Sequence, residues 1–369
     1  MIHNSYTASS FANQLTVNLK AVVANWRQLG ALGKGVGCAA VVKADAYGLG
    51  AIPIAKALAA AGCQEFFVAS VDEGQSLRAA IGKGADIYVL NGLVGGAIED
   101  FLGHDLRPVL NALCQIERWQ EQVGQAPCAV MLDTGMTRLG ISTRELSVLL
   151  DKGPSLNLVL ALSHLACADD PSAEKNSVQL QHFRHCVELL KPLYPGLRAS
   201  LSSTAGIGLG DGYHFDLLRP GIGLYGASPD PNNAWPWLAS VVELRLPVIQ
   251  VRTLIQQATV GYGASQTVVG GSTLATVYGG YADGLMRSVA GRGFGYLAGV
   301  RVPLVGRVSM DYCVFDITDA VPCLVDDGQE WQIEILGPHQ TVDEIALQSG
   351  TIGYEVLTSM GCRYQRRYV

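Results

Sequence analysis

The chain has 369 residues, of which 49% are hydrophobic and 16% are charged, and its formal net charge is −6. A chain of this size and composition can build substantial buried cores, and its length predicts two domains. The negative charge and the absence of a Lys/Arg-rich run argue against a nucleic-acid or anionic-membrane surface, so a small-molecule substrate is expected. No stretch approaches the ~18 apolar residues of a membrane span, and the first residues lack the features of a secretory signal, which favours the cytoplasm.

From about residue 36 to residue 226, short apolar runs alternate with segments of helical period. Eight runs have the length and composition of buried strands, at 37–42, 66–70, 86–90, 106–110, 128–132, 158–163, 198–202 and 216–219. The first helical face precedes Gly30, which is the predicted helix end. Eight strand–helix alternations predict a TIM-like α/β barrel of eight parallel strands, which we assign to residues 14–231.

The pattern changes after residue 226. The Pro/Asn-rich segment ASPDPNNAWPW is followed by alternating apolar and polar residues, for example at 243–254 and 331–337. Such alternation is typical of half-buried antiparallel strands. We therefore predict a mainly antiparallel β domain over 232–369, which residues 1–18 could join.

The cysteines and histidines predict neither a disulfide framework nor a metal site. The nine cysteines are an odd number and include no C-x-x-C pair. His182 and His185 have helical spacing, but no cysteine or carboxylate signature accompanies them, so a solvated helix face is expected.

One lysine, Lys43, follows the first predicted strand within the stretch VVKADAYGLG at 41–50. Catalytic groups of parallel barrels gather at the C-terminal ends of the strands, so this amine is predicted to face the barrel mouth. Apolar surroundings would lower the pKa of Lys43 and make its amine able to form an imine. A single lysine at a strand end is more often a surface residue, so the position alone does not decide its role.

Glycine-rich loops follow the seventh and eighth predicted strands, at 203–210 and 219–226. Barrels often bind phosphate at these two loops, where backbone N–H groups can point at an anion. A phosphate site opposite an imine-forming lysine suggests pyridoxal phosphate. Residues 221–226 also satisfy G-x-G-x-x-G, but a dinucleotide site needs a βαβ unit to follow, whereas a linker and antiparallel strands follow here.

Eight motifs occur in order along nearly the whole chain: VVKADAYGLG (41–50), LDTGMTRLG (132–140), SHLACAD (163–169), RPGIGLYG (219–226), VGYGA (260–264), GGYADG (279–284), RVSMD (307–311) and TIGYEV (351–356). Together they make the chain resemble the bacterial alanine racemases, which are fold type III pyridoxal-phosphate enzymes. The resemblance implies a barrel and a β domain in a head-to-tail homodimer.

Residue by residue, the resemblance implies that Lys43 holds the cofactor as an imine and then acts as one of two proton-transfer bases, with Tyr262 as the other. Racemisation needs a base on each face of the α-carbon. Because a phenol has an ordinary pKa of about 10 and is a poor base at neutral pH, this tyrosine needs positive neighbours. In the family these match His164 and Arg219.

The resemblance also assigns Arg219 to the pyridine nitrogen of the cofactor. A guanidinium keeps its proton, so it can donate a hydrogen bond without protonating the ring. An unprotonated ring is a weaker electron sink, which favours return of the proton to the α-carbon over transamination.

Further binding residues are implied by the same resemblance. The cofactor phosphate would be held by Tyr47, Thr204, Gly221, Ile222 and Tyr354. The alanine carboxylate would be met by Arg138 and the N–H of Met310, with Tyr281 closing the entrance and Asp311 lining the site. In the family, the positions of Tyr262, Tyr281, Met310 and Asp311 are contributed by the other subunit, so a dimer would be required for activity.

One departure from the family affects Arg138. Many members have a carbamylated lysine that orients this arginine, whereas this chain has Met131 at that position. A bound anion or another side chain must then orient Arg138.

The leading hypothesis is interconversion of L- and D-alanine, which would supply D-alanine for peptidoglycan. A racemase of broader or shifted specificity, such as one for serine, is the closest alternative, and the pocket near Tyr354 and Tyr281 would decide between them. A decarboxylase of the same fold type would place an acidic residue opposite the pyridine nitrogen, where this chain has Arg219. A non-catalytic pyridoxal-phosphate-binding protein would lack the β domain.

Overall fold

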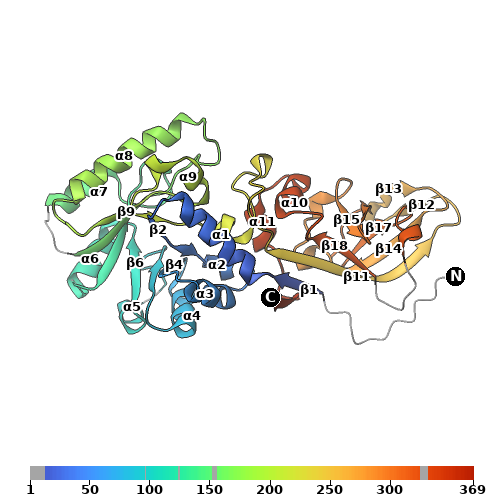
Figure 1. Ribbon diagram of the computed structural model, residues 1–369, viewed down its shortest axis with the longest axis horizontal. Coiled ribbons are helices and arrows are strands. Elements are labelled where there is room, and N and C mark those ends of the chain that lie inside the picture. Colours follow the sequence, from blue (N-terminus) through green and yellow to red (C-terminus); the bar gives the residue numbers. More distant parts are fainter. Residues whose placement is uncertain (1–12, 96, 124, 152–155, 325–330) are drawn as a thin grey trace. The chain divides into compact units, whose positions relative to one another are not determined.

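The computed structural model describes residues 13–95, 97–123, 125–151, 156–324 and 331–369. The chain forms two compact units (Figure 1). The first is Val22–Leu224, and the second combines Met1–Ala21 with Tyr225–Val369. The predicted domain boundary between residues 231 and 232 stays a prediction. None of the helices in the described ranges has the length and apolar character needed to cross a membrane.

The first unit is built from parallel strands that alternate with helices, and the expected barrel is confirmed. Its described strands are β2 (Gly37–Cys38), β3 (Ala40–Val41), β4 (Glu65–Val68), β5 (Asp86–Val89), β6 (Leu106–Leu110), β7 (Pro127–Met131), β8 (Asn157–Leu162), β9 (Arg198–Ser200) and β10 (Leu217–Leu218). Strands β3 to β9 are hydrogen-bonded in sequence order as one parallel sheet. These strands are buried along most of their length, which explains why they appear in the sequence as continuous apolar runs.

Strand β10 closes this sheet into a barrel. On one side it pairs in parallel with β2, with Leu217 opposite Gly37 and Leu218 opposite Cys38. On the other side, the N–H of Arg219 donates to the carbonyl of Ser202 at 2.9 Å, so β10 also contacts the chain that follows β9. All C-terminal strand ends therefore meet at one mouth.

Helices cover the outside of the barrel, as the ribbon shows (Figure 1). The outer helices are α1 (Leu19–Leu32), α3 (Ala51–Ala60), α4 (Val71–Ile81), α5 (Ile98–Gly103), α6 (Leu113–Gln122), α7 (Thr143–Asp151) and α8 (Glu174–Leu190). The short segments α2 (Lys43–Tyr47) and α9 (Thr204–Gly208) follow the C-terminal ends of β3 and β9. The predicted end of α1 at Gly30 is wrong, because the helix continues to Leu32. A Cβ on Gly30 would lie 3.3 Å from the Cβ of Cys38, so this glycine serves close packing inside the helix.

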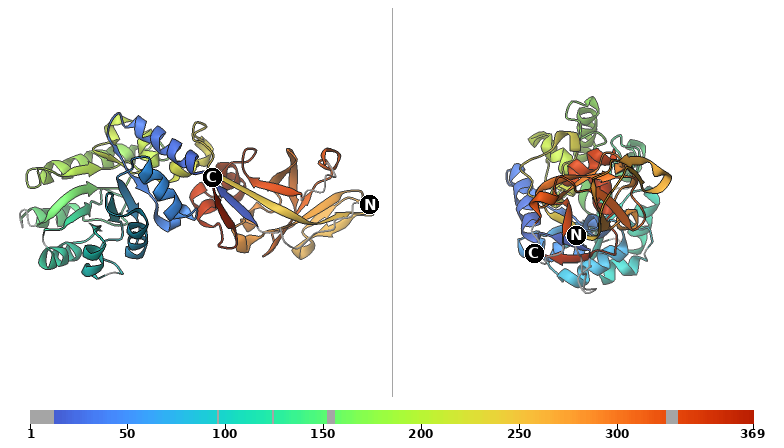
Figure 2. Two further views of the ribbon diagram at one scale, coloured as in Figure 1. Left: turned by 60° about the horizontal axis from the view of Figure 1, so that its bottom comes forward. Right: turned by 90° about the vertical axis from the view of Figure 1, so that its right-hand side faces the viewer.

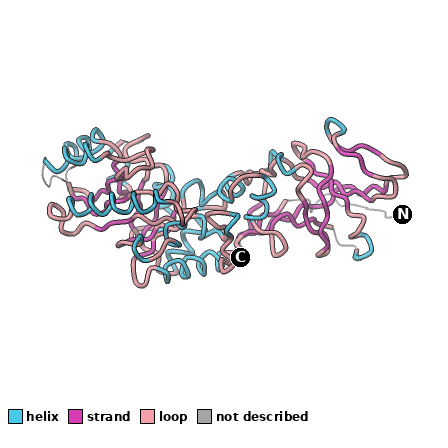
Figure 3. The backbone as a smooth tube through the Cα atoms, turned by 90° about the horizontal axis from the view of Figure 1, so that it is seen from above, coloured by secondary structure: helices cyan, strands magenta, loops and turns pink. Residues whose placement is uncertain are grey.

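The second unit is dominated by antiparallel strands (Figure 3), as predicted. Its main described sheet contains β1 (Gln14–Val17), β11 (Val242–Thr253), β14 (Thr273–Tyr278), β15 (Phe294–Leu297), β16 (Val300–Val305), β17 (Tyr312–Asp316), β18 (Gln332–Leu336) and β19 (Gln365–Tyr368). A hairpin of β12 (Ala258–Val260) and β13 (Gln266–Val268) and the helices α10 (Val342–Ser349) and α11 (Gly353–Thr358) complete it. Strand β1 pairs antiparallel with β11 and parallel with β19, beside which it lies in Figure 2. Residues 1–12 of the N-terminal segment lie outside the described residues.

Each unit has its own apolar core. Phe66, Phe67 and Tyr88 are fully buried in the barrel, and full burial of such a ring contributes on the order of 2–3 kcal/mol. In the second unit, Val260 and Leu274 belong to a buried cluster under the β12–β13 hairpin. The loops at the strand ends are thus anchored on rigid elements.

Candidate active site

Lys43 begins α2, two residues after the end of β3. The three residues that follow, Ala44, Asp45 and Ala46, have left-handed backbone angles with φ of 53°, 52° and 53°. Left-handed geometry costs a non-glycine residue roughly 1–2 kcal/mol, and such strain is concentrated at functional sites. The Glu73 carboxylate on α4 fixes the turn, since it accepts the N–H of Ala44 at 2.8 Å.

The surroundings of Lys43 favour an uncharged amine. Burial lowers the pKa of Lys43 most, the nearby Arg138 guanidinium lowers it further, and the Glu73 carboxylate raises it by a smaller effect. A lysine with a lowered pKa is a better nucleophile and base near neutral pH.

Arg219 is a buried cation without an ion-pair partner among the described residues. Its Nη2 donates to the carbonyl of Ser163 at 2.6 Å, and its Nη1 donates to the Ser200 hydroxyl. The guanidinium lies 5.9 Å from the centroid of the Phe67 ring. Burial lowers the pKa of Arg219 to about 10, so the group stays charged at neutral pH. Because an unpaired buried charge is costly, this arrangement indicates that a ligand supplies an acceptor.

His164 follows β8, and its backbone is held by Gln179 of α8. The fully buried Gln179 amide donates to the His164 carbonyl at 3.0 Å and accepts the N–H of Ala166 at 2.8 Å. The same amide donates to the Thr134 hydroxyl at 3.2 Å. Gln179 therefore ties the loop after β7 to the loop after β8.

The His164 imidazole is uncharged at neutral pH. Burial lowers the pKa of His164 to about 3, with further lowering by Arg219, Arg138 and Lys43. Of the two groups expected to place positive charge beside Tyr262, Arg219 is the one that carries a charge at neutral pH.

The expected phosphate loops meet at the Thr204 hydroxyl, which is buried at the start of α9. This oxygen accepts the N–H of Gly221 at 2.9 Å and that of Gly223 at 3.3 Å, and its own hydrogen can still be donated to an anion. A Cβ on Gly221 would overlap the Tyr47 hydroxyl. The next residue, Ile222, begins the short helix η2 (Ile222–Tyr225). A close approach of Tyr47, Thr204 and Gly221 thus requires a glycine here.

Arg138 lies on the loop that follows β7, and its residue is exposed. The Asp133 carboxylate shapes this loop by accepting the N–H of Gly135 at 2.9 Å and that of Thr137 at 3.0 Å. Met131, which stands where the family often has a lysine, is buried at the end of β7. The loop geometry is set locally, and no described side chain takes over the orienting role of the lysine through a hydrogen bond to Arg138.

The remaining predicted site residues lie in the second unit. Tyr262, Tyr281 and Met310 are 69%, 43% and 53% exposed, and each occupies a turn or loop. Exposed apolar side chains of this size mark interaction surfaces when they cluster. Asp311 forms an ion pair with Arg363 at 2.7 Å. Tyr354 is the second residue of α11 and is half-buried.

The structure thus divides the predicted site residues into two sets. Those that follow barrel strands in the first unit are Lys43, Tyr47, Arg138, His164, Thr204, Arg219, Gly221 and Ile222. Those in the second unit are Tyr262, Tyr281, Met310, Asp311 and Tyr354. In the described ranges, no group of three or more His, Cys, Asp or Glu residues could hold a metal ion.

The sequence reasoning missed the residues that support these groups. Glu73 has capping-box spacing to Ser70, but its carboxylate bonds to the backbone of Ala44 and Ala69 instead. No local sequence signal distinguishes Gln179 or Arg363, because their partners are distant in the chain.

Comparison with known proteins matches both units. Residues 17–229 match the family model "Alanine racemase, N-terminal domain", and residues 241–368 match "Alanine racemase, C-terminal domain". A protein named alanine racemase from Rhodospirillum rubrum is 46% identical over 362 residues, which cover 96% of this chain and 95% of that protein. A protein named "Alanine racemase, catabolic" from Mesorhizobium japonicum is 43% identical and covers 96% of this chain and 93% of its own length.

A solved structure also matches this chain over nearly its full length. The crystal structure of alanine racemase from Bartonella henselae with covalently bound pyridoxal phosphate aligns with a TM-score of 0.87 and 37% sequence identity, covering 97% of this chain and 99% of that one.

Proposed function

The chain belongs to the alanine racemase family, and from this premise we propose that it interconverts L- and D-alanine by a two-base reaction of Lys43 and Tyr262. The observation that carries the proposal is the Lys43 amine, whose pKa is lowered by burial and by Arg138, at the same barrel mouth as the buried, unpaired Arg219. A base and a fixed cation of this kind suit removal of a proton next to a carboxylate.

The cofactor is pyridoxal phosphate, and the residues at the mouth fit it. The unpaired Arg219 guanidinium has a hydrogen-bond donor for the ring nitrogen, and Thr204, Tyr47 and the glycine-rich loop at Gly221 and Ile222 have donors for the phosphate. Tyr354 of the second unit is proposed as a further phosphate ligand on the family resemblance alone. When bound, the cofactor supplies a conjugated ring that withdraws electrons from the α-carbon of the amino acid. Lys43 is the residue that would hold it covalently.

In the proposed reaction, Lys43 and Tyr262 work on opposite faces of the α-carbon. The Lys43 amine moves the proton on one face and the Tyr262 hydroxyl on the other, so one group removes the proton from one enantiomer and the other group adds a proton on the opposite face to form the other enantiomer. Arg219 keeps its proton and therefore limits electron withdrawal, which favours return of the proton to the α-carbon. His164, uncharged at neutral pH, acts as a hydrogen-bond partner in this network.

The substrate carboxylate is proposed to bind Arg138 and the N–H of Met310, with Tyr281 closing the entrance and Asp311 lining it. The exposed guanidinium of Arg138 offers parallel N–H donors that match a carboxylate.

We further propose a homodimer in which the exposed turns of one second unit complete the barrel mouth of the partner. The exposure of Tyr262, Tyr281 and Met310 supports a covering surface. Mixing inactive Lys43→Ala and Tyr262→Phe chains under conditions that exchange subunits tests this. A shared site predicts recovery of about a quarter of wild-type activity, since half of the dimers are mixed and each has one complete site. No recovery would place both bases on one chain.

The reaction itself is tested in heavy water. Wild-type enzyme should convert L-alanine to the racemate with deuterium at the α-carbon, measured by mass spectrometry. In Tyr262→Phe, deuterium exchange should be almost lost with one enantiomer of alanine as substrate and largely kept with the other. The reason is that each enantiomer is deprotonated by a different base. Racemisation without deuterium uptake would refute the two-base proposal.

For the cell, we propose that the enzyme acts in the cytoplasm and supplies D-alanine for peptidoglycan. Deletion of the gene should then make growth dependent on added D-alanine. Growth without D-alanine but loss of growth on alanine as carbon source would instead indicate a catabolic role.

A further inference from the structure

Asp283 of the second unit is a fully buried carboxylate that is paired with Arg363. The Arg363 Nε lies 2.8 Å from Oδ1 of Asp283, and its Nη2 donates to Oδ2 at 2.9 Å. The third guanidinium nitrogen, Nη1, lies 2.7 Å from the Asp311 carboxylate. One side chain therefore links a buried and a half-exposed carboxylate.

Asp283 also fixes the turn that carries Tyr281. Its Oδ2 accepts the N–H of Gly280 at 2.9 Å, and its carbonyl accepts the N–H of Gly361 at 3.0 Å. The turn over 280–284 is therefore tied to the segment that contains Arg363.

The same turn is tied to the loop that carries Met310. The N–H of Tyr281 donates to the Ser309 carbonyl at 3.0 Å, and the N–H of Ala282 donates to the Met310 carbonyl at 3.0 Å. A Cβ on Gly280 would overlap the carbonyl oxygens of Ser309 and Met310, so the two backbones touch. Arg363 adds a second link between these two segments, because it pairs with Asp283 in one and with Asp311 in the other.

We infer that Arg363 is a positioning residue that, with Asp283 and Asp311, sets the spacing between Tyr281 and the Met310 N–H and so determines the affinity for the substrate carboxylate. The inference rests on the proposed function, in which these two groups face the substrate. A planar guanidinium can hold two carboxylates at once, here through hydrogen bonds to Asp283 and Asp311, whereas a lysine ammonium acts as a point charge.

The kinetic signature separates positioning from catalysis. Lys43 and Tyr262 lie outside the two turns, so loss of Arg363 should raise KM for alanine at least tenfold while kcat stays within about threefold of wild type. Arg363→Lys should show a smaller increase than Arg363→Ala. Added guanidinium chloride at low millimolar concentration should lower KM for Arg363→Ala without changing the wild type. The exposed Arg367 on β19 provides the matched control, and Arg367→Ala should behave as wild type.

Arg363→Ala leaves the Asp283 charge buried and unpaired, which can unfold the domain. The double variant Asp283→Asn/Arg363→Met removes both charges and avoids this, and its KM should remain raised at a melting temperature close to wild type. An unchanged KM in this folded double variant overturns the inference. So does a fall in kcat of Arg363→Ala as large as its rise in KM, if added guanidinium restores neither. These outcomes leave the proposed function standing, because wild-type deuterium exchange tests that separately.

Discussion

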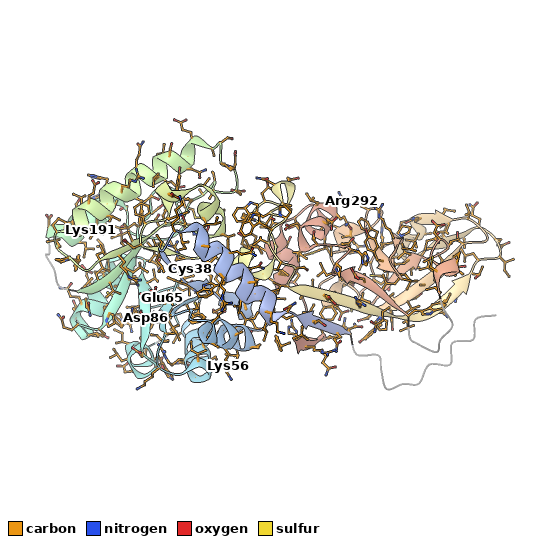
Figure 4. The ribbon with its side chains drawn as sticks, viewed as in Figure 1. Cys38, Lys56, Glu65, Asp86, Lys191 and Arg292 are labelled. Atoms are coloured by element: carbon orange, nitrogen blue, oxygen red, sulfur yellow. The ribbon has the colours of Figure 1, made fainter. Side chains whose placement is uncertain are left out.

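The Glu65 carboxylate and the Arg198 guanidinium form a two-point ion pair, with Nη2 2.5 Å from Oε1 and Nη1 3.0 Å from Oε2. Glu65 begins β4 and Arg198 begins β9, so the pair joins strands 133 residues apart in the chain. Asp86 begins the neighbouring strand and lies close to Glu65 (Figure 4). The Asp86 carboxylate forms an ion pair with Arg107 at 2.5 Å. The N-terminal end of the barrel is therefore held by charge pairs, away from the Lys43 mouth.

Breaking this pair should destabilise the barrel without changing its chemistry. Glu65→Gln keeps the side-chain shape but leaves Arg198 unpaired, and Glu65 is only 12% exposed. We expect a loss of roughly 2–3 kcal/mol in the free energy of unfolding, below the value for a fully buried pair because Arg198 is 37% exposed. Urea unfolding of wild type and Glu65→Gln measures this difference in the free energy of unfolding. Asp211→Asn, which breaks the exposed Lys34 pair, is the control and should leave the urea midpoint unchanged. A midpoint shared by Glu65→Gln and wild type contradicts the prediction.

Gly221→Ala should weaken pyridoxal-phosphate binding. The new methyl group would overlap the Tyr47 hydroxyl and lie 3.1 Å from ring carbon Cζ, so the phosphate donors must move apart. An overpacking cost of ~1–3 kcal/mol corresponds to a rise in Kd of roughly fivefold to a hundredfold, measured by spectroscopic titration of cofactor-free protein. Gly196→Ala, whose Cβ meets open space, should not change the Kd.

A second comparison isolates the clash at Gly221. In a Tyr47→Phe background the overlapping oxygen is absent, so Gly221→Ala should raise the Kd by a smaller factor than it does in wild type. An equal factor in both backgrounds would show that the methyl group acts through another contact.

The barrel could be predicted because the pattern that specifies each of its strands lies within a few consecutive residues. Each parallel strand is buried on both faces and therefore appears as a short apolar run, as at β4 and β7. The predicted helix end at Gly30 was wrong because a contact distant in the sequence determines this residue. Close packing against Cys38 favours a glycine inside the helix, whereas the local pattern predicts a helix end.

The supporting contacts of the site could not be predicted in the same way. Lys43 and Arg219 were identified from motifs, but the Gln179 bond to His164 and the Arg363 bridge to Asp283 join residues that only the folded chain brings together. The neutral state of His164 was missed for the same reason, because its pKa depends on burial and on three cations from other loops.

Glu73 should control the pH at which Lys43 captures the cofactor. The Glu73 carboxylate raises the pKa of Lys43, so Glu73→Gln should lower it further. Because the uncharged amine is the reactive form, the rate of pyridoxal-phosphate uptake by cofactor-free protein should reach half its maximum at a lower pH than in wild type. Stopped-flow absorbance from pH 6 to pH 10 measures this. Asp72→Asn on the same helix turn is the control, and a shift of equal size there would exclude a specific effect of Glu73.

His164 should make the stability of the protein fall in mild acid. Its pKa is about 3 in the folded chain against an ordinary value of 6.5, so below pH 6.5 the unfolded chain binds a proton that the folded chain does not. The unfolding free energy therefore decreases as pH falls through 6.5 and keeps decreasing until about pH 3. At pH 5 the loss attributable to this group is on the order of 1–2 kcal/mol. Urea unfolding of cofactor-free wild type and His164→Gln at equal protein concentration, at pH 7 and pH 5, should show a smaller pH effect in the variant, since the other titrating groups are shared. If both proteins lose the same free energy between the two pH values, the imidazole is not held neutral by the fold.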